Sequence, residues 1–198
     1  MYPQTLRDLI EALRVLPGVG HKSAFRMALY LLDRDKEGAK AIELGIHNAL
    51  ERIRRCNQCR NITDQPLCDF CQDETRHNGQ ICIVESPSDV FALSQNVAYK
   101  GRYFVLHGRL SPLDGIGPEE LGLDLLENTL QSGSISELIL ATNSTVEGEA
   151  TAFYIDELTK PYKIKVTRIA HGVPMGGELE YLDEGTLAHA FKARQNFN

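Results

Sequence analysis

The chain has 198 residues, of which 42% are hydrophobic and 24% charged, and its formal net charge is −6. This length suits one domain or two small ones, and this composition is typical of a globular protein with a packed core. No apolar run approaches the ~18 residues that a membrane-spanning helix needs. The N-terminus lacks the basic-then-apolar layout of a secretory signal, so we expect a cytoplasmic protein.

The charge is distributed unevenly along the chain. Residues 1–55 carry ten Lys and Arg against seven Asp and Glu, whereas residues 80–198 carry nine against sixteen. A basic N-terminal part on an acidic body is typical of a protein that contacts nucleic acid at one end. Chance is the alternative explanation for numbers this small.

Residues 1–55 are predicted to be helical, because apolar residues recur there every three or four positions. Within this part, the stretch LPGVGHKSAFRMALYLL places Gly18 and Gly20 between two helices, as in a helix-hairpin-helix. Glycines let the chain turn tightly and let a ligand approach the backbone. The N–H groups at the start of the next helix favour a phosphate, and Lys22 and Arg26 add positive charge beside it.

These four residues are therefore predicted to bind DNA through its phosphates, without regard to base sequence. The alternative is an ordinary pair of helices joined by a glycine turn, since Gly-x-Gly alone is a weak signal. A hairpin this short makes few phosphate contacts, so one copy is expected to bind weakly.

Residues 56–78 are polar and contain two Cys-x-x-Cys pairs, Cys56 with Cys59 and Cys68 with Cys71. Four thiolates on tight turns form the tetrahedral ligand set of structural zinc sites, with no open position for catalysis. We predict one structural zinc per chain. Disulfides are the alternative, but a cytoplasmic chain is kept reduced. A redox Cys-x-x-Cys is a second alternative, and the duplication of the pair argues against it.

From residue 79 onward, short apolar runs alternate with helical stretches, which predicts a mainly parallel α/β sheet. The expected strands cover residues 81–86, 102–108, 137–142 and 163–170, and the expected helices cover 87–95, 118–131 and 147–159. We assign this α/β domain to residues 79–173 and a C-terminal extension to residues 174–198.

Polar residues follow two of the expected strands, at the ends where α/β sheets build their sites. Glu85 ends the first strand and Asp89 lies one turn into the next helix, while Asn143 and Thr145 follow a later strand. A metal site is one interpretation of this pattern. A helix cap is the other, because Ser144 and Glu147 form an S-x-x-E capping box.

These motifs together resemble the RecR family of bacterial recombination mediators, over nearly the whole chain. The resemblance is carried by the four cysteines and by LPGVGHKSAFRMA, QICIVESPSDVFAL, GRYFVLHGRLSPLDGIGPE, ILATNSTVEGEATAFYI and RIAHGVPMGGELE. It implies that the α/β domain is a Toprim fold, which is shared with topoisomerases, primases and some nucleases.

Active Toprim enzymes combine a strand-end glutamate with a Thr-Asp-x-Asp-x-Glu-Gly-Glu loop. In this chain, residues 142–149 read TNSTVEGE, so Asn143 and Thr145 stand at the two aspartate positions. Magnesium prefers hard carboxylate oxygens, for which these side chains are poor substitutes. The sequence therefore predicts a Toprim domain without its metal and a protein without enzymatic activity.

The resemblance further implies a DNA-repair protein that works with RecO, and in some settings RecF, to load RecA on single-stranded DNA. Family members form rings or clamps of several subunits, which would repeat a weak DNA contact. Glu85, Asp89 and Glu147 are then expected to contact a basic partner such as RecO.

Two other classes of function remain open on the sequence alone. In the first, Glu85, Glu147 and Glu149 hold a metal in a Toprim nuclease or topoisomerase-like enzyme. In the second, the hairpin makes only subunit contacts and the protein is a scaffold that never touches DNA.

Overall fold

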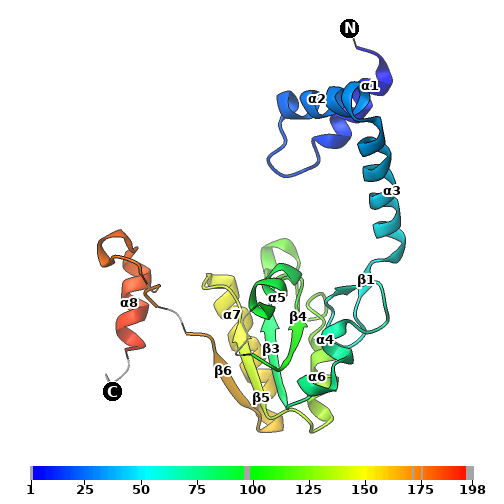
Figure 1. Ribbon diagram of the computed structural model, residues 1–198. Coiled ribbons are helices and arrows are strands. Elements are labelled where there is room, and N and C mark those ends of the chain that lie inside the picture. The colour runs from blue at the N-terminus through cyan, green and yellow to red at the C-terminus, as the bar shows by residue number, and fades with distance from the viewer. Residues whose placement is uncertain (1, 96–98, 171, 175, 195–198) are drawn as a thin grey trace. The chain divides into compact units, whose positions relative to one another are not determined.

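The computed structural model describes residues 2–95, 99–170, 172–174 and 176–194, and its chain divides into two compact units, Met1–Ile53 and Arg54–Asn198 (Figure 1). The first unit contains Gln4–Leu13 (α1), His21–Leu29 (α2), the π-helical turn Tyr30–Arg34 (η1) and Lys36–Arg52 (α3). The strands of the second unit are Arg54–Arg55 (β1), Ile62–Thr63 (β2), Gln80–Val84 (β3), Arg102–Val105 (β4), Glu137–Ala141 (β5) and Lys165–Arg168 (β6). Its helices are Asp69–Gln72 (α4), Glu74–Arg76 (η2), Pro87–Ser94 (α5), Pro112–Asp114 (η3), Leu123–Gln131 (α6), Val146–Thr159 (α7), Lys160–Tyr162 (η4), Leu179–Tyr181 (η5) and Glu184–Lys192 (α8).

Two alanines let α1 and α2 of the first unit pack closely. Ala24 and Ala28 on α2 are fully buried, and Ile10 on α1 packs against them. Small side chains at such a crossing bring the two helix backbones together, which fixes the turn that joins them. The predicted helical character of this part is confirmed.

The first unit also exposes much apolar surface. No residue of α3 is buried. A hollow of about 580 Å³ opens on this unit, and its lining combines Arg26 and Ser23 with the apolar residues Leu13, Leu16, Met27, Tyr30, Leu31, Ile42 and Ile46. Several of these side chains are half exposed or more, including Tyr30 and Ile46.

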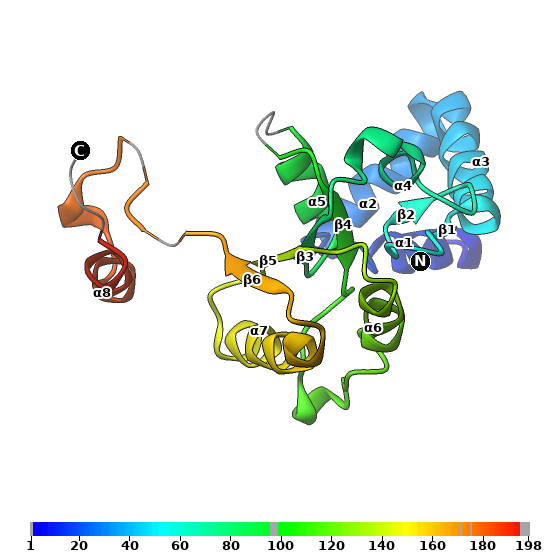
Figure 2. The ribbon, with the colours of Figure 1, turned by 90° about the horizontal axis from the view of Figure 1, so that it is seen from below.

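The second unit is built on a parallel sheet of four strands in the order β4-β3-β5-β6. Successive side chains of a strand point to opposite faces. Ile81 and Ile83 of β3 therefore enter the core under α6 and α7, whereas Cys82 and Val84 enter the core under α5. Figure 2 shows α6 and α7 on one side of the sheet and α5 on the other. The predicted α/β architecture is confirmed.

Three expected boundaries shift because the backbone takes left-handed conformations. The strand expected at 102–108 ends at Val105, since His107 has φ of 60° and the following glycine also has a positive φ. The helix expected at 118–131 begins only at Leu123, after Gly122 with φ of 67°. The strand expected at 163–170 begins at Lys165, after Lys163 with φ of 53°.

The cysteine-containing segment packs along the outer edge of β4. Val105 N–H donates to the Cys59 carbonyl at 2.8 Å, which satisfies an edge donor of the sheet. Arg60 Nη2 donates to the Glu120 carbonyl at 2.8 Å, and the Arg60 carbonyl lies 2.6 Å from His107 Nε2. Arg60 thus fastens this segment to the loop that follows β4.

Among the described residues, no helix has both the length and the apolar composition needed to cross a membrane.

We predict that Arg60→Met destabilises the second unit by about 1–3 kcal/mol, because it leaves the Glu120 carbonyl without its donor while keeping an unbranched aliphatic stem. Denaturant unfolding measures the change. Arg55→Met is the matched control, since Arg55 lies on β1 in the same segment and is exposed. Equal losses for the two variants would contradict the role assigned to Arg60.

Candidate functional site

The four predicted zinc ligands come together in the structure. The sulfur atoms of Cys56, Cys59, Cys68 and Cys71 lie within 4.8 Å of one another, and all four residues are buried. Sulfurs bound at about 2.3 Å to a tetrahedral zinc lie about 3.8 Å apart, so the cluster has the size that zinc requires. The Cys59 and Cys68 sulfurs are 3.3 Å apart, too far for the ~2.05 Å bond of a disulfide.

The backbone around the cysteines prepares the cluster for a metal. Cys68 N–H donates to the Cys56 sulfur at 3.3 Å, and Cys56 N–H donates to the Asn61 carbonyl at 2.7 Å. The Cys59 and Cys68 sulfurs share a hydrogen bond, which lowers the pKa of the Cys68 thiol and raises the pKa of the Cys59 thiol. Zinc binds thiolates, so a bound metal replaces the protons that these buried sulfurs otherwise share. Cys82 lies outside the cluster, and burial raises the pKa of its thiol to about 12.

The hairpin between α1 and α2 has an uncapped helix start. Gly20 is the N-cap of α2 and no side chain bonds to the first turn. A Cβ added to Gly18 or Gly20 would meet no atom within 4 Å, so open space surrounds both. Gly18 has φ of 76° and needs glycine for that reason, whereas Gly20 has an ordinary φ of −81°. Lys22 and Arg26 are both exposed on α2.

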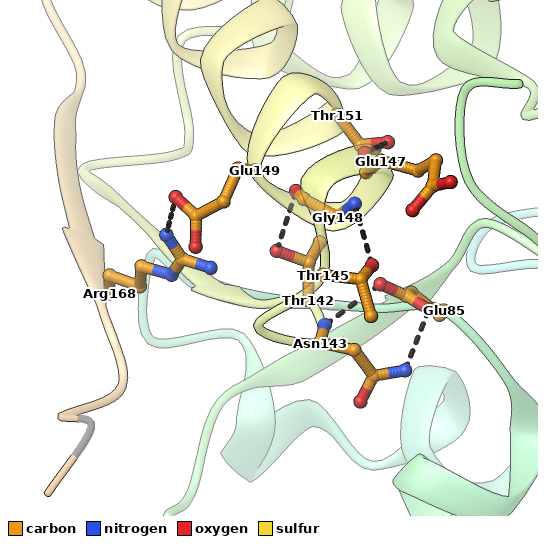
Figure 3. Close-up of polar contacts among 9 residues, drawn as sticks. All are labelled: Glu85, Thr142, Asn143, Thr145, Glu147, Gly148, Glu149, Thr151 and Arg168. Carbon is orange, nitrogen blue, oxygen red and sulfur yellow. Dashed lines mark hydrogen bonds and ion pairs between the residues drawn. The ribbon is translucent and has the colours of Figure 1, made fainter. Parts of the chain in front are cut away.

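At the Toprim-like strand ends, Glu85 is bonded to Asn143 (Figure 3). Glu85 is 6% exposed, and it follows the central strand β3. Asn143 donates from its backbone N–H to Glu85 Oε1 at 2.8 Å and from its Nδ2 to Oε2 at 2.7 Å. Both carboxylate oxygens therefore have a donor from the chain itself, and Asn143 is the first of the two residues expected to replace the aspartates of a metal-binding Toprim loop.

The predicted capping box of Ser144 and Glu147 is wrong. Thr145 is the N-cap of α7, and its hydroxyl accepts from Gly148 N–H at 3.1 Å. Ser144 and Thr145 are adjacent hydroxyl residues. Thr145 is the N-cap because the N–H of Gly148, three residues later, faces its hydroxyl. A Cβ on Gly148 would lie 2.1 Å from the Asn143 carbonyl oxygen, so the start of α7 packs tightly on this loop.

The remaining acidic residues near α7 differ in their surroundings. Glu149 forms an ion pair of 2.6 Å with Arg168, which reaches from β6 toward α7 (Figure 3). Glu147 is half-buried, and Figure 3 draws no contact from its carboxylate. Among the described residues, only the four cysteines form a cluster of three or more metal-binding groups, so Glu85, Glu147 and Glu149 do not.

Asp89 belongs to a different capping box. Its carboxylate accepts from Ser86 N–H at 2.8 Å, and the Ser86 hydroxyl accepts from Asp89 N–H at 3.3 Å. This box starts α5, with Pro87 at the first helical position. The S-x-x-D spacing of Ser86 and Asp89 is the local signal in the sequence for this cap.

Two arginines that position the site are not signalled by the sequence. Arg60 joins the cysteine segment to the loop after β4, and Arg168 pairs with Glu149. Their partners lie 60 and 19 residues away along the chain, so no local spacing indicates either contact.

Four family models match the chain in the order of the structural parts. They are the RecR helix-hairpin-helix at residues 6–50, the RecR zinc finger domain with four cysteines at 53–73, the Toprim domain at 79–170 and the RecR C-terminal region at 172–195. The zinc finger model and the close cysteines together establish one structural zinc.

Curated relatives match over nearly their full length. "Recombination protein RecR" of Methylococcus capsulatus is 55% identical over 192 residues, which cover 97% of each chain. The protein of the same name from Saccharophagus degradans is 54% identical over 195 residues, which cover 98% of this chain and 99% of the relative. That of Xanthomonas euvesicatoria is 52% identical over 189 residues, or 96% of each chain.

The fold and the sites define a Toprim protein with a helix-hairpin-helix and a structural zinc finger. The names of the relatives support a protein of DNA recombination and repair. The chain belongs to the RecR family.

We predict that Cys68→Ser lowers the zinc content of the purified protein well below one ion per chain and lowers its melting temperature. Structural zinc supplies on the order of 10–16 kcal/mol of apparent binding free energy in finger peptides. Elemental analysis and thermal unfolding measure the two changes. Cys82→Ala is the control that should keep its zinc. Loss of zinc without any change in melting temperature would show that the metal does not stabilise the fold.

A second prediction concerns the Toprim strand ends. Asn143→Asp together with Thr145→Asp should destabilise the second unit by about 1–3 kcal/mol, because Glu85 loses a donor and faces a like charge. Magnesium should restore much of this loss by binding the folded state alone. Thermal unfolding with and without magnesium is the measurement, with exposed Asn128→Asp as the control. A magnesium effect no larger than that of the control would contradict the interpretation.

Proposed function

We propose that this protein is a non-enzymatic mediator that binds DNA without sequence preference and works with RecO, and in some settings RecF. Together they would load RecA onto single-stranded DNA coated by its binding protein. Membership of the RecR family supports the role in recombination. We further propose that the protein works in the cytoplasm, where the chromosome lies.

The open start of α2 is the observation that carries the DNA-binding part of the proposal. Its first-turn N–H groups have no side-chain cap, and glycine leaves the approach to them free. The positive end of the helix dipole lies there, and a phosphate satisfies both the donors and the dipole. Exposed Lys22 and Arg26 stand one turn apart on the same helix, where they add charge near the same phosphate.

Assembly of several copies would raise the overall affinity for DNA above that of one weak hairpin contact. The exposed apolar side chains of the first unit, with their hollow of about 580 Å³, support contact with a second copy of the chain. Each added copy repeats the hairpin on the same DNA, so affinity rises without a new kind of contact.

Of the three acidic residues expected to contact a basic partner, Glu147 is best placed. Glu85 is buried against Asn143, and Asp89 is bonded to the start of α5. Glu147 is more accessible than Glu85 and can reach a Lys or Arg side chain of a partner. We therefore propose that Glu147 carries the contact with RecO.

The same geometry supports the absence of enzymatic activity. Phosphate chemistry on metal ions needs cations clamped on the reacting oxygens. In this chain Glu85 is bonded to Asn143 through both oxygens, and Glu149 is paired with Arg168. Both of these carboxylates, which would hold such a cation in an enzyme, thus have a partner from the protein.

We predict that Lys22→Ala with Arg26→Ala weakens binding to unrelated DNA sequences about equally. The slope of log affinity against log salt should flatten by about 0.7–0.9 for each phosphate that the variant no longer neutralises. The same variant should slow RecA assembly on coated single strands in the presence of RecO. Lys40→Ala, on α3 and paired with Glu37, is the matched control.

Other results would change the assignment. If the double variant binds DNA with the wild-type affinity and salt slope but fails to assemble, the hairpin is a subunit interface and the protein a scaffold. If clean wild-type protein cleaves DNA with magnesium or manganese, and Glu85→Ala abolishes cleavage, the protein is an enzyme.

A further inference from the structure

The loop between β4 and α6, residues 106–122, has a tip of fixed shape. Ser111 and Ile116 exchange backbone hydrogen bonds of 3.0 and 2.9 Å across the tip. The buried Ser111 hydroxyl donates to Asp114 Oδ2 at 2.7 Å. We call residues 106–122 the β4–α6 loop.

Both arms of the β4–α6 loop are anchored to other parts of the second unit. Leu110 N–H donates to Thr151 Oγ1 of α7 at 2.9 Å. Arg60 donates to the Glu120 carbonyl at 2.8 Å, and His107 Nε2 lies 2.6 Å from the Arg60 carbonyl oxygen. The loop is therefore held by the zinc segment on one side and by α7 on the other.

The tip presents one leucine fully to solvent. Leu113 is 100% exposed and stands between Pro112 and Asp114 in η3. An isolated exposed leucine is common on protein surfaces. Leu113 differs from such leucines because it lies at the apex of an ordered loop. Ordering the loop costs conformational entropy, and the exposed side chain buries no apolar surface that would offset this cost.

The β4–α6 loop and the start of α6 are rich in acidic residues. Asp114, Glu119, Glu120 and Asp124 are all exposed in or just after the loop, and Arg109 is the one basic residue of that stretch. A partner protein that matches this loop has an apolar pocket with Lys and Arg side chains around its edge. Charge complementarity of this kind selects the partner and speeds its approach.

The loop is also connected to Glu147. The Thr151 hydroxyl that accepts from Leu110 N–H itself donates to the Glu147 carbonyl at 2.7 Å. One side chain thus ties the β4–α6 loop to the first turn of α7, which carries Glu147.

We propose that Leu113 is the apolar anchor with which this protein holds its basic protein partner. The proposal rests on the function proposed above, in which Glu147 contacts that partner. Leu113 enters an apolar pocket of the partner, while Glu147 and the acids of the loop pair with the basic rim. A buried apolar anchor governs the dissociation rate, whereas exposed charges govern the association rate.

Purified RecO is the probe, and its binding to full-length protein is followed by surface plasmon resonance. Leu113→Ala should raise the dissociation rate about tenfold, as expected for an interface anchor. Leu113→Met should restore most of the affinity because it keeps an apolar side chain of similar volume. Glu147→Gln should lower the association rate and its dependence on salt. Leu179→Ala, which truncates an exposed leucine elsewhere, is the control.

The outcomes separate this proposal from the proposed function. If wild-type protein does not bind RecO, the proposed partnership fails and the anchor with it. If wild-type protein binds and Leu113→Ala dissociates at the same rate, only the anchor fails. If Leu113→Ala lowers the mass of the protein alone in light scattering, the pocket belongs to a second copy and the proposal is overturned. Melting temperature should not change, since Leu113 makes no buried contact.

Discussion

The zinc tetrahedron is the constraint on which the arrangement of the second unit depends. The segment between Cys56 and Cys71 is too short to build an apolar core, so the metal holds its two turns together. Once held, the segment supplies the Cys59 carbonyl to the edge strand β4 and Arg60 to the loop beyond it. That loop reaches α7 through Thr151. Hydrogen bonds and the backbone of the loop thus link the zinc segment to the first turn of α7.

At the Toprim strand ends, groups of the chain itself satisfy the carboxylates that a bound metal is expected to satisfy in related enzymes. A buried carboxylate such as Glu85 is costly unless its oxygens are bonded. Asn143 supplies two donors from one residue, and Arg168 supplies a cation to Glu149. These contacts hold the Toprim loop in a fixed geometry without a metal. A surface of fixed geometry is compatible with a role in contacting other proteins.

Local patterns in the sequence predict much of this molecule. Continuous apolar runs such as Ile81–Val84 mark strands covered on both faces, and Cys-x-x-Cys pairs mark the zinc ligands, because both signals lie within a few residues. Predicted boundaries are wrong where one residue adopts a left-handed conformation, as at His107 and Gly122.

The remaining differences between prediction and structure have two physical causes. The predicted cap of α7 is wrong because Ser144 and Thr145 are adjacent hydroxyl residues and only the backbone direction chooses between them. Contacts made by Arg60 and Arg168 join distant segments, so no spacing rule reveals them.

The shallow core of the first unit has a consequence for how the proposed DNA contact forms. Among residues 2–53, only Ile10, Ala24 and Ala28 are buried. So few buried side chains cannot balance the conformational entropy of a unit this long. Whatever covers its exposed apolar side chains must supply part of its folding free energy. The open start of α2 would then be fully formed only in copies whose exposed apolar side chains are covered. Only those copies would be able to bind DNA.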